Sequence, residues 1–300
     1  MPNWNQILNE IKAAGSTHDI VRRRYLQELH KKTGRNIIAY YSGWLQKTGI
    51  HGVEINDEDK NGFMTVIHEL DRSLGLDLIL HTPGGDTAAT ESIVYYLRSM
   101  FGTNMRAIVP QIAMSGGTMI ACACREIIMG KPSNLGPIDP HFGGIPAHGV
   151  LEEFSRAVKE VKEDPGTIPI WQAIVAKYSP SFLGECQKAY EWATEVTAEW
   201  LASGMFSQEP NPQEKARAVV KDLADHALTK SHSRHLHLER CKEIGLKISV
   251  LEDDQDLQER VLSVHHAFMI TLSDTSAFKI IENHNGVAFI KLAHPVIRAS

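Results

Sequence analysis

The sequence lacks the features of several large classes of protein. No window approaches the roughly 18 consecutive apolar residues of a membrane span. The N-terminal segment has no basic start followed by an apolar stretch, as a signal peptide would. No block of basic residues is present and the net charge is −5, which disfavours a nucleic-acid-binding protein. We therefore expect a cytoplasmic protein with no transmembrane segment and no nucleic-acid partner.

Cysteine is scarce, and motifs for common cofactors are missing. None of Cys122, Cys124, Cys186 and Cys241 forms a CxxC pair, so neither a zinc ribbon nor a thioredoxin motif is indicated. A GxGxxG fingerprint with a downstream acid is absent, as is a GxxxxGK[ST] phosphate loop. These absences predict a reducing compartment and no cofactor. Any unfolding of a substrate would need a separate partner.

What the chain does contain indicates an α/β fold. Its 300 residues are 43% hydrophobic, enough to bury a sizeable core. Strands and helices alternate, as in layered α/β proteins. The pattern predicts strands over 36–44, 76–81, 105–110 and 126–130, and helices over 1–32, 61–75, 87–101, 115–124 and 151–205. Thr87 or Thr90 is expected to cap the helix that ends near Phe101.

The expected organisation has three parts. Residues 1–32 form an N-terminal helical segment, 33–205 a catalytic domain and 206–300 a mixed C-terminal extension. Glycine and proline make 131–150 loop-like, and Asn211-Pro212 marks a plausible linker.

The first chemical motif is LILHTPGGD, residues 78–86. A buried strand ends abruptly at a turn that contains Gly84 and Gly85. Consecutive glycines let the backbone take unusual angles and let a ligand approach closely. Exposed N–H groups ahead of a helix favour developing negative charge, which is the requirement for an oxyanion hole. A plain strand-to-helix turn is the alternative.

The second motif is IVPQIAMSGGTMIA, residues 108–121. Ser115 follows a strand and opens a helix of small residues, which suits a nucleophile with an exposed hydroxyl. The motif is not the GxSxG elbow, because no glycine lies two residues before the serine. A serine that merely caps the helix is the alternative.

Together the motifs resemble the Clp-protease/crotonase superfamily, and in particular the serine dehydrogenase proteinases. The resemblance covers about residues 20–290 and is carried by TGRNIIAYYSGW (33–44), LDLILHTPGG (76–85), AMSGGTMIA (113–121), SNLGPIDP (133–140), HHAF (265–268) and KIIENHNG (279–286). It implies a ClpP/crotonase-like layered fold of repeated β-β-α units with a helical and small mixed α/β extension. Gly116 departs from the alanine expected in many relatives, a small change that keeps the site open.

The resemblance also implies residue roles. Ser115 would attack a carbonyl, while the N–H groups of Gly116 and of Gly84 or Gly85 would hold the oxyanion. His141 follows the serine at the spacing of the Clp-protease histidine, with Asp139 in support. A serine–lysine dyad is the alternative, with the lysine drawn from Lys131, Lys159, Lys162 and Lys188.

The sequence therefore predicts a serine peptidase that cleaves polypeptide through an acyl-enzyme and, by the superfamily resemblance, assembles into a homo-oligomer. A crotonase-like enzyme acting on acyl-CoA and a non-catalytic peptide-binding scaffold remain alternatives. The spacing of His232, His235 and His237 suggests a zinc site, but a helix turn or partner-contacting surface is the favoured interpretation, so no metal is expected.

Overall fold

The computed structural model describes residues 4–13, 18–224 and 234–293. The strands are β1 (Asn36–Ser42), β2 (Leu76–His81), β3 (Met105–Val109), β4 (Ile112–Ala113), β5 (Glu126–Met129), β6 (Asn134–Leu135), β7 (His141–Phe142), β8 (Ile145–Pro146), β9 (Leu236–His237), β10 (Ile248–Val250), β11 (Ala277–Asn283) and β12 (Ala288–Leu292). The helices are α1 (Trp4–Ala13), α2 (His18–Thr33), α3 (Glu58–Ile67), α4 (Thr87–Phe101), α5 (Gly116–Cys122), α6 (Ala147–Glu163), α7 (Ile168–Val175), α8 (Phe182–Ser203), α9 (Pro212–Ala224), α11 (Leu238–Ile244) and α12 (Gln255–Asp274).

A seven-stranded sheet lies at the centre, in the order β10-β5-β3-β2-β1-β11-β12. The five strands from β10 to β1 are parallel, whereas β11 is antiparallel to both of its neighbours, β1 and the edge strand β12. The sheet thus takes strands from both halves of the chain. Because β10, β11 and β12 complete it, most of the C-terminal segment folds against the segment that carries the two motifs.

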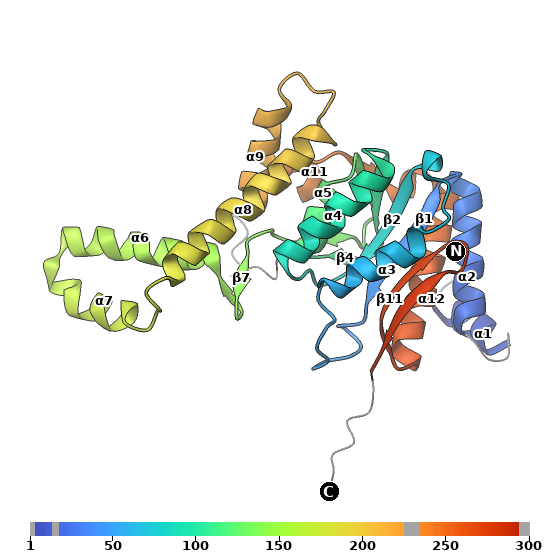
Figure 1. Cartoon of the computed structure of the whole chain (residues 1–300), viewed down its shortest axis with the longest axis horizontal. Coiled ribbons are helices and arrows are strands. Elements are labelled where there is room, and N and C mark those ends of the chain that lie inside the picture. The colour runs from blue at the N-terminus through green and yellow to red at the C-terminus, as the bar shows by residue number, and fades with distance from the viewer. Residues whose placement is uncertain (1–3, 14–17, 225–233, 294–300) are drawn as a thin grey trace, which may run out of the picture.

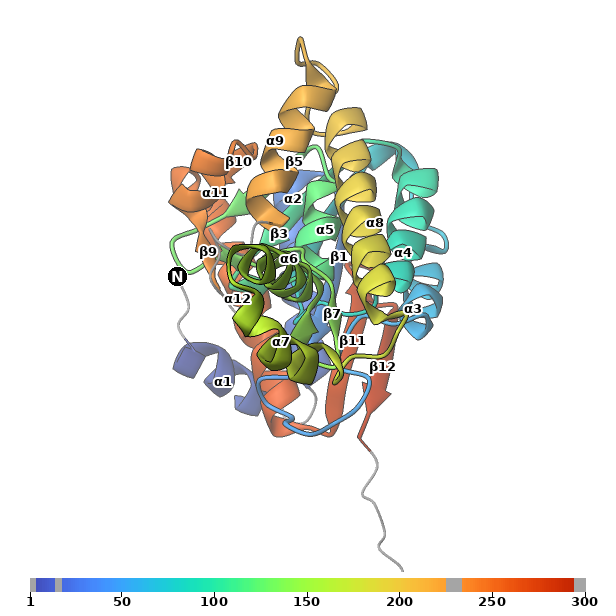
Figure 2. The same ribbon diagram turned by 90° about the vertical axis from the view of Figure 1, so that its left-hand side faces the viewer.

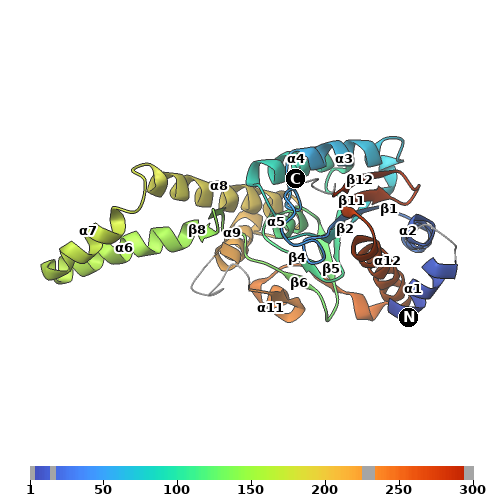
Figure 3. The ribbon, with the colours of Figure 1, turned by 90° about the horizontal axis from the view of Figure 1, so that it is seen from below.

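Helices cover both faces of the sheet, which explains why its central strands β1, β2 and β3 are buried and mostly apolar (Figure 3). Successive residues point to opposite faces. In β1, Ile38 and Tyr40 enter the core shared with α3, α4 and α5, while Ile37 and Tyr41 enter the core shared with α2 and α12. The expected layered α/β fold is confirmed.

An arm made of α6, α7 and the first half of α8 projects away from the sheet (Figure 1). Seen end-on in Figure 2, it points toward the viewer. Its small core includes Val150 and Cys186, with Phe154 and Phe182 packed against them. The second half of α8 returns to the body, where Trp200 joins the main core. The sequence predicted these helices but not their projection.

Two local predictions were wrong. The helix expected over 61–75 ends at Ile67, and Gly75, with φ +69°, closes a separate 3₁₀ turn at Arg72–Leu74. The cap of α4 is Asp86, whose carboxylate accepts from the N–H of Ala89, while the Thr90 hydroxyl donates to the Asp86 carbonyl. Asp86 has the extended backbone that an N-cap requires. None of the helices in the described ranges is long and apolar enough to cross a membrane.

Candidate active site

A groove of about 600 Å³ lies at the carboxyl end of β2, where α/β sheets commonly bind ligands. Its lining joins both sequence motifs to the loop before the arm. The lining includes Gly84, Gly85, Ser115, His141, Phe142 and Trp192. Segments that are about thirty residues apart in the sequence therefore share one cavity.

Ser115 lies at the turn between β4 and α5 in a strained conformation, with φ +48° and ψ −115°. Among the described non-glycine residues, only Glu69 and Ser115 have positive φ. Such strain concentrates at functional sites. The side chain makes no capping hydrogen bond to α5, so Ser115 does not serve as a conventional helix cap. Its hydroxyl is left available beside the groove.

Backbone hydrogen bonds hold the two motifs together at Thr82. The Thr82 N–H donates to the Ile112 carbonyl at 3.2 Å, and the Met114 N–H donates to the Thr82 carbonyl at 3.0 Å. Gly84 adopts φ +90°, and a Cβ atom placed there would lie 2.6 Å from the Cβ of Ser115. Glycine is therefore required at 84 by both the backbone angle and the close approach of the serine.

The N–H groups of the glycine turn and of Gly116 differ in whether they have a hydrogen-bond acceptor. The Gly84 N–H donates to the Thr82 hydroxyl at 3.2 Å, and the Gly84 carbonyl accepts from Ile55 at 2.7 Å. Within the described ranges no acceptor lies in hydrogen-bond reach of the Gly85 or Gly116 N–H. A Cβ atom on Gly116 would lie 3.5 Å from the Gly85 nitrogen, so the two unpaired donors are neighbours.

Gly116 itself is closely surrounded. A Cβ atom there would lie 2.6 Å from the Thr90 hydroxyl oxygen and 3.2 Å from Ile55 Cδ1. The alanine expected in relatives would require Thr90 to move. The missing side chain of Gly116 thus leaves room for the Thr90 hydroxyl.

His141 lines the same groove from β7, on a hairpin whose turn residues, Gly143 and Gly144, both have positive φ. Its Nε2 atom lies 3.3 Å from Oδ2 of Asp139. The His141 side chain is 23% exposed and the Asp139 side chain 1%. A buried carboxylate thus holds a solvent-accessible imidazole, although no direct hydrogen bond joins that imidazole to Ser115. Such contacts are often loose before substrate binds.

The other candidates lie elsewhere. No lysine is among the described residues that line the groove, so Lys131, Lys159, Lys162 and Lys188 are outside it. His232 lies outside the described residues, whereas His235 and His237 are exposed. The described chain contains no cluster of three histidine, cysteine, aspartate or glutamate side chains suited to a metal.

His81 is fully buried just before the glycine turn, and its ring contacts the rings of Tyr41, Trp44 and His265. Burial lowers the pKa of His81 to about 3. Neither ring nitrogen has a hydrogen-bond partner among the residues that the structure describes. His81 is therefore a neutral packing residue.

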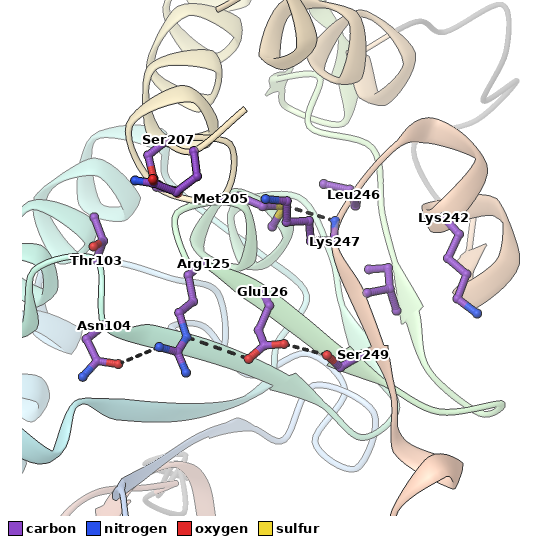
Figure 4. Close-up of a pocket in the computed structure, with 13 residues that line it drawn as sticks. Thr103, Asn104, Arg125, Glu126, Met205, Ser207, Lys242, Leu246, Lys247 and Ser249 are labelled. Atoms are coloured by element: carbon purple, nitrogen blue, oxygen red, sulfur yellow. Dashed lines mark hydrogen bonds and ion pairs between the residues drawn. The ribbon is translucent and has the colours of Figure 1, made fainter. Parts of the chain in front are cut away.

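A larger cavity, of about 830 Å³, lies at the amino ends of β3, β5 and β10. It is rich in charge, but Arg125 and Glu126 bind each other and neighbouring polar side chains (Figure 4). The Glu126 carboxylate accepts from Ser249 at 2.6 Å, and Arg125 donates to Asn104 at 3.1 Å. The Lys247 ammonium lies 2.9 Å from Glu209. Within the described ranges, none of the residues lining this cavity has a positive φ, unlike Ser115.

Comparison with known proteins identifies the family. The model of the ClpP-like SDH-type serine proteinases matches residues 8–264. The chain belongs to that family. The resemblance expected from the two motifs is therefore confirmed, and it includes the ClpP-like fold.

Two similar proteins come from Methanocaldococcus jannaschii. Uncharacterized protein MJ1495 is 30% identical over 76% of this chain and 71% of its own length. Uncharacterized protein MJ0137 is 29% identical over 76% of this chain and 73% of its own length. Neither name assigns an activity, so the chemistry is argued from the geometry.

Proposed function

We propose that this protein is a serine peptidase that hydrolyses polypeptides through an acyl-enzyme on Ser115. The observation that carries the proposal is the strained, uncapped Ser115 beside two unpaired N–H groups, those of Gly85 and Gly116. Gly116 is buried, and buried donors normally find partners, so its free N–H next to that of Gly85 and beside a serine favours a site for developing negative charge.

In the proposed reaction the Ser115 hydroxyl oxygen attacks the scissile carbonyl carbon and passes its proton to His141. The carbonyl oxygen becomes an oxyanion that accepts from Gly85 and Gly116. His141 then protonates the leaving amine, and the C–N bond breaks to give the acyl-enzyme. Water hydrolyses the ester by the same route in reverse. Each oxyanion donor contributes about 2.7–4 kcal/mol of transition-state stabilisation.

The sequence left Gly84 and Gly85 as equal candidates for the second donor. Gly85 is the better candidate, because the Gly84 N–H already donates to Thr82 and because Gly85 is exposed to the groove. Asp139 would hold the His141 ring and stabilise its charged form during the reaction. Phe142 and Trp192, which also line the groove, would contact the substrate chain.

The test is covalent labelling with a fluorophosphonate probe. The wild-type protein is expected to gain one adduct, located by peptide mass spectrometry on Ser115, and Ser115→Ala to gain none. Hydrolysis of a denatured protein such as casein is expected to disappear in the same variant. An unlabelled wild-type protein, or casein hydrolysis that persists in Ser115→Ala, would refute the proposal.

The proposal also covers the oligomeric state and the cellular location of the protein. The arm exposes apolar side chains, with Val158 at 56% and Ile170 at 63%, which supports a homo-oligomer formed through it. Light scattering after size-exclusion chromatography should give a multiple of 33.4 kDa, and a monomer would contradict this. All four cysteines are free and buried, which supports a cytoplasmic location.

A further inference from the structure

A buried ion pair lies behind the glycine turn. Lys279, on β11, and Asp59, on α3, both have fully buried side chains. The Lys279 ammonium donates to Asp59 Oδ1 at 2.8 Å, to Asp59 Oδ2 at 2.9 Å and to the Glu54 carbonyl at 2.7 Å. Burying two charges is costly, and apolar residues often give equal or greater stability. Stability alone therefore does not explain why this ion pair is present.

The pair fixes the segment 54–56 from both ends. Lys279 holds the Glu54 carbonyl, and Asp59 Oδ2 accepts from the Asn56 N–H at 3.1 Å. Ile55, between them, donates to the Gly84 carbonyl at 2.7 Å and accepts from the Asp86 N–H at 3.0 Å. The residues on both sides of Gly85 are thus hydrogen-bonded to Ile55, in a segment that the ion pair holds in place.

A second route reaches the same turn through Tyr40. The Tyr40 hydroxyl donates to Asp59 Oδ2 at 2.8 Å, and the tyrosine lies next to the Thr82 side chain. The Thr82 hydroxyl in turn accepts from the Gly84 N–H. Thr82 also binds the backbone of Met114, next to Ser115. The network therefore contacts both halves of the site.

We propose that Lys279, Asp59 and Tyr40 are positioning residues that aim the Gly85 N–H at the oxyanion. This inference rests on the proposed function. None of the three lines the groove, so they act only through the 54–56 segment and Thr82. Lys279 is not a catalytic base, because its three protons are donated to Asp59 and Glu54.

The test compares two lysine–acid pairs that join α3 to the β11–β12 hairpin. The variant Lys279→Met/Asp59→Asn removes both buried charges together and leaves neither unpaired. The control, Lys291→Met, breaks the exposed pair between Lys291 and Glu58. Two quantities are measured: the rate of fluorophosphonate labelling at Ser115, and the hydrogen exchange of peptides covering 52–58 and 82–89. Exchange reports how often the hydrogen bonds of the turn open, whether or not the protein is catalytic.

In the double variant, exchange in both peptides should rise at least tenfold, because the bonds at Ile55 and Asp86 open more often. Labelling should slow by about 10²–10³-fold, the loss of one oxyanion donor, with the KM of a peptide substrate unchanged. Lys291→Met should change both quantities by less than about twofold, as expected for a surface pair. Tyr40→Phe, which removes one hydroxyl, should raise exchange by about five- to tenfold.

Unchanged exchange in the folded double variant would overturn the inference, as would a normal labelling rate alongside fast exchange. If the double variant does not fold, Tyr40→Phe decides the question by the same two measurements. A wild-type protein that is never labelled would instead refute the proposed function, and the exchange rates alone would then decide the positioning role.

Discussion

Polar groups at the two ends of the parallel strands differ in whether they have hydrogen-bond partners. At the amino ends, the buried carboxylate of Asp77 accepts from Arg35 at 2.6 Å and from Arg106 at 2.6 and 2.7 Å. At the carboxyl ends, the N–H groups of Gly85 and Gly116 have no acceptor within the described part of the chain. The Asp77 carboxylate at the amino end is saturated by its two arginines, whereas the two glycine N–H groups at the carboxyl end keep unused hydrogen-bonding capacity. Two unused donors beside a strained serine, and not charge or cavity size, distinguish the candidate site.

The largest expected effect is at the carboxyl end. His141→Gln should lower the rate of fluorophosphonate labelling by about 10²–10⁴-fold, the usual contribution of a general base. Because His141 lies on a surface hairpin, the thermal midpoint of unfolding should not move. Labelling at the wild-type rate would mean that another group is the base. The carboxyl end would then lack one of the reactive groups that set it apart from the amino end.

The amino end should respond in stability alone. Asp77→Ala leaves Arg35 and Arg106 facing each other without their shared carboxylate. The free energy of unfolding in urea should fall by about 3 kcal/mol, the lower end of the range for a broken buried pair, because both arginines retain some exposure. The labelling rate of the folded protein should stay the same. If Asp77→Ala kept its stability but lost labelling at Ser115, the amino end would have a role in activity, which would contradict the comparison.

Gly116→Ala tests how closely the carboxyl end is packed. The new methyl group would meet the Thr90 hydroxyl, which should cost about 1–3 kcal/mol of unfolding free energy. Thr90→Ala removes the obstructing atom, so adding it to Gly116→Ala should recover part of that loss. A double-mutant cycle that measures the four unfolding free energies checks this. Strict additivity would show that Thr90 and residue 116 do not touch.

The smallest effect is a pH dependence that comes from His81. Its pKa is about 3 in the folded protein and about 6.5 when unfolded, so between these values the unfolded chain binds more protons. Stability should therefore fall as the pH falls below 6.5, by up to about 1.4 kcal/mol per pH unit from this group. Urea unfolding at pH 6.5 and 5.5 measures the slope. A slope that is the same in His81→Phe would assign it to other residues.

The parts of the fold that depend on neighbouring residues were predictable from the sequence. Continuous apolar runs located β1, β2 and β3, and Pro83, Gly84 and Gly85 located the turn, because both signals are local. The α4 cap is Asp86 and not Thr87 or Thr90, because Asp86 has the extended backbone that lets its carboxylate accept from the Ala89 N–H. The limits 1–32, 33–205 and 206–300 stay predictions, although β10, β11 and β12 lie in the central sheet.

The rest depends on contacts between distant residues. Lys279 and Asp59 are 220 positions apart, and no periodicity in the sequence indicates that they meet. The same holds for the close approach of Thr90 and Gly116, which are separated in the chain by most of α4 and by the strands β3 and β4. Of the candidate site, the nucleophile and the glycines follow from motifs, while the network behind them follows only from the packed structure.

The central claim is that Gly85 and Gly116 hold negative charge beside Ser115. A crystal structure of the fluorophosphonate adduct tests it most directly, because the phosphonyl oxygen mimics the oxyanion. The account predicts a covalent bond to Ser115 Oγ, with that oxygen about 2.7–3.1 Å from both glycine nitrogens. An oxygen that points into solvent, or an adduct on another residue, would contradict it.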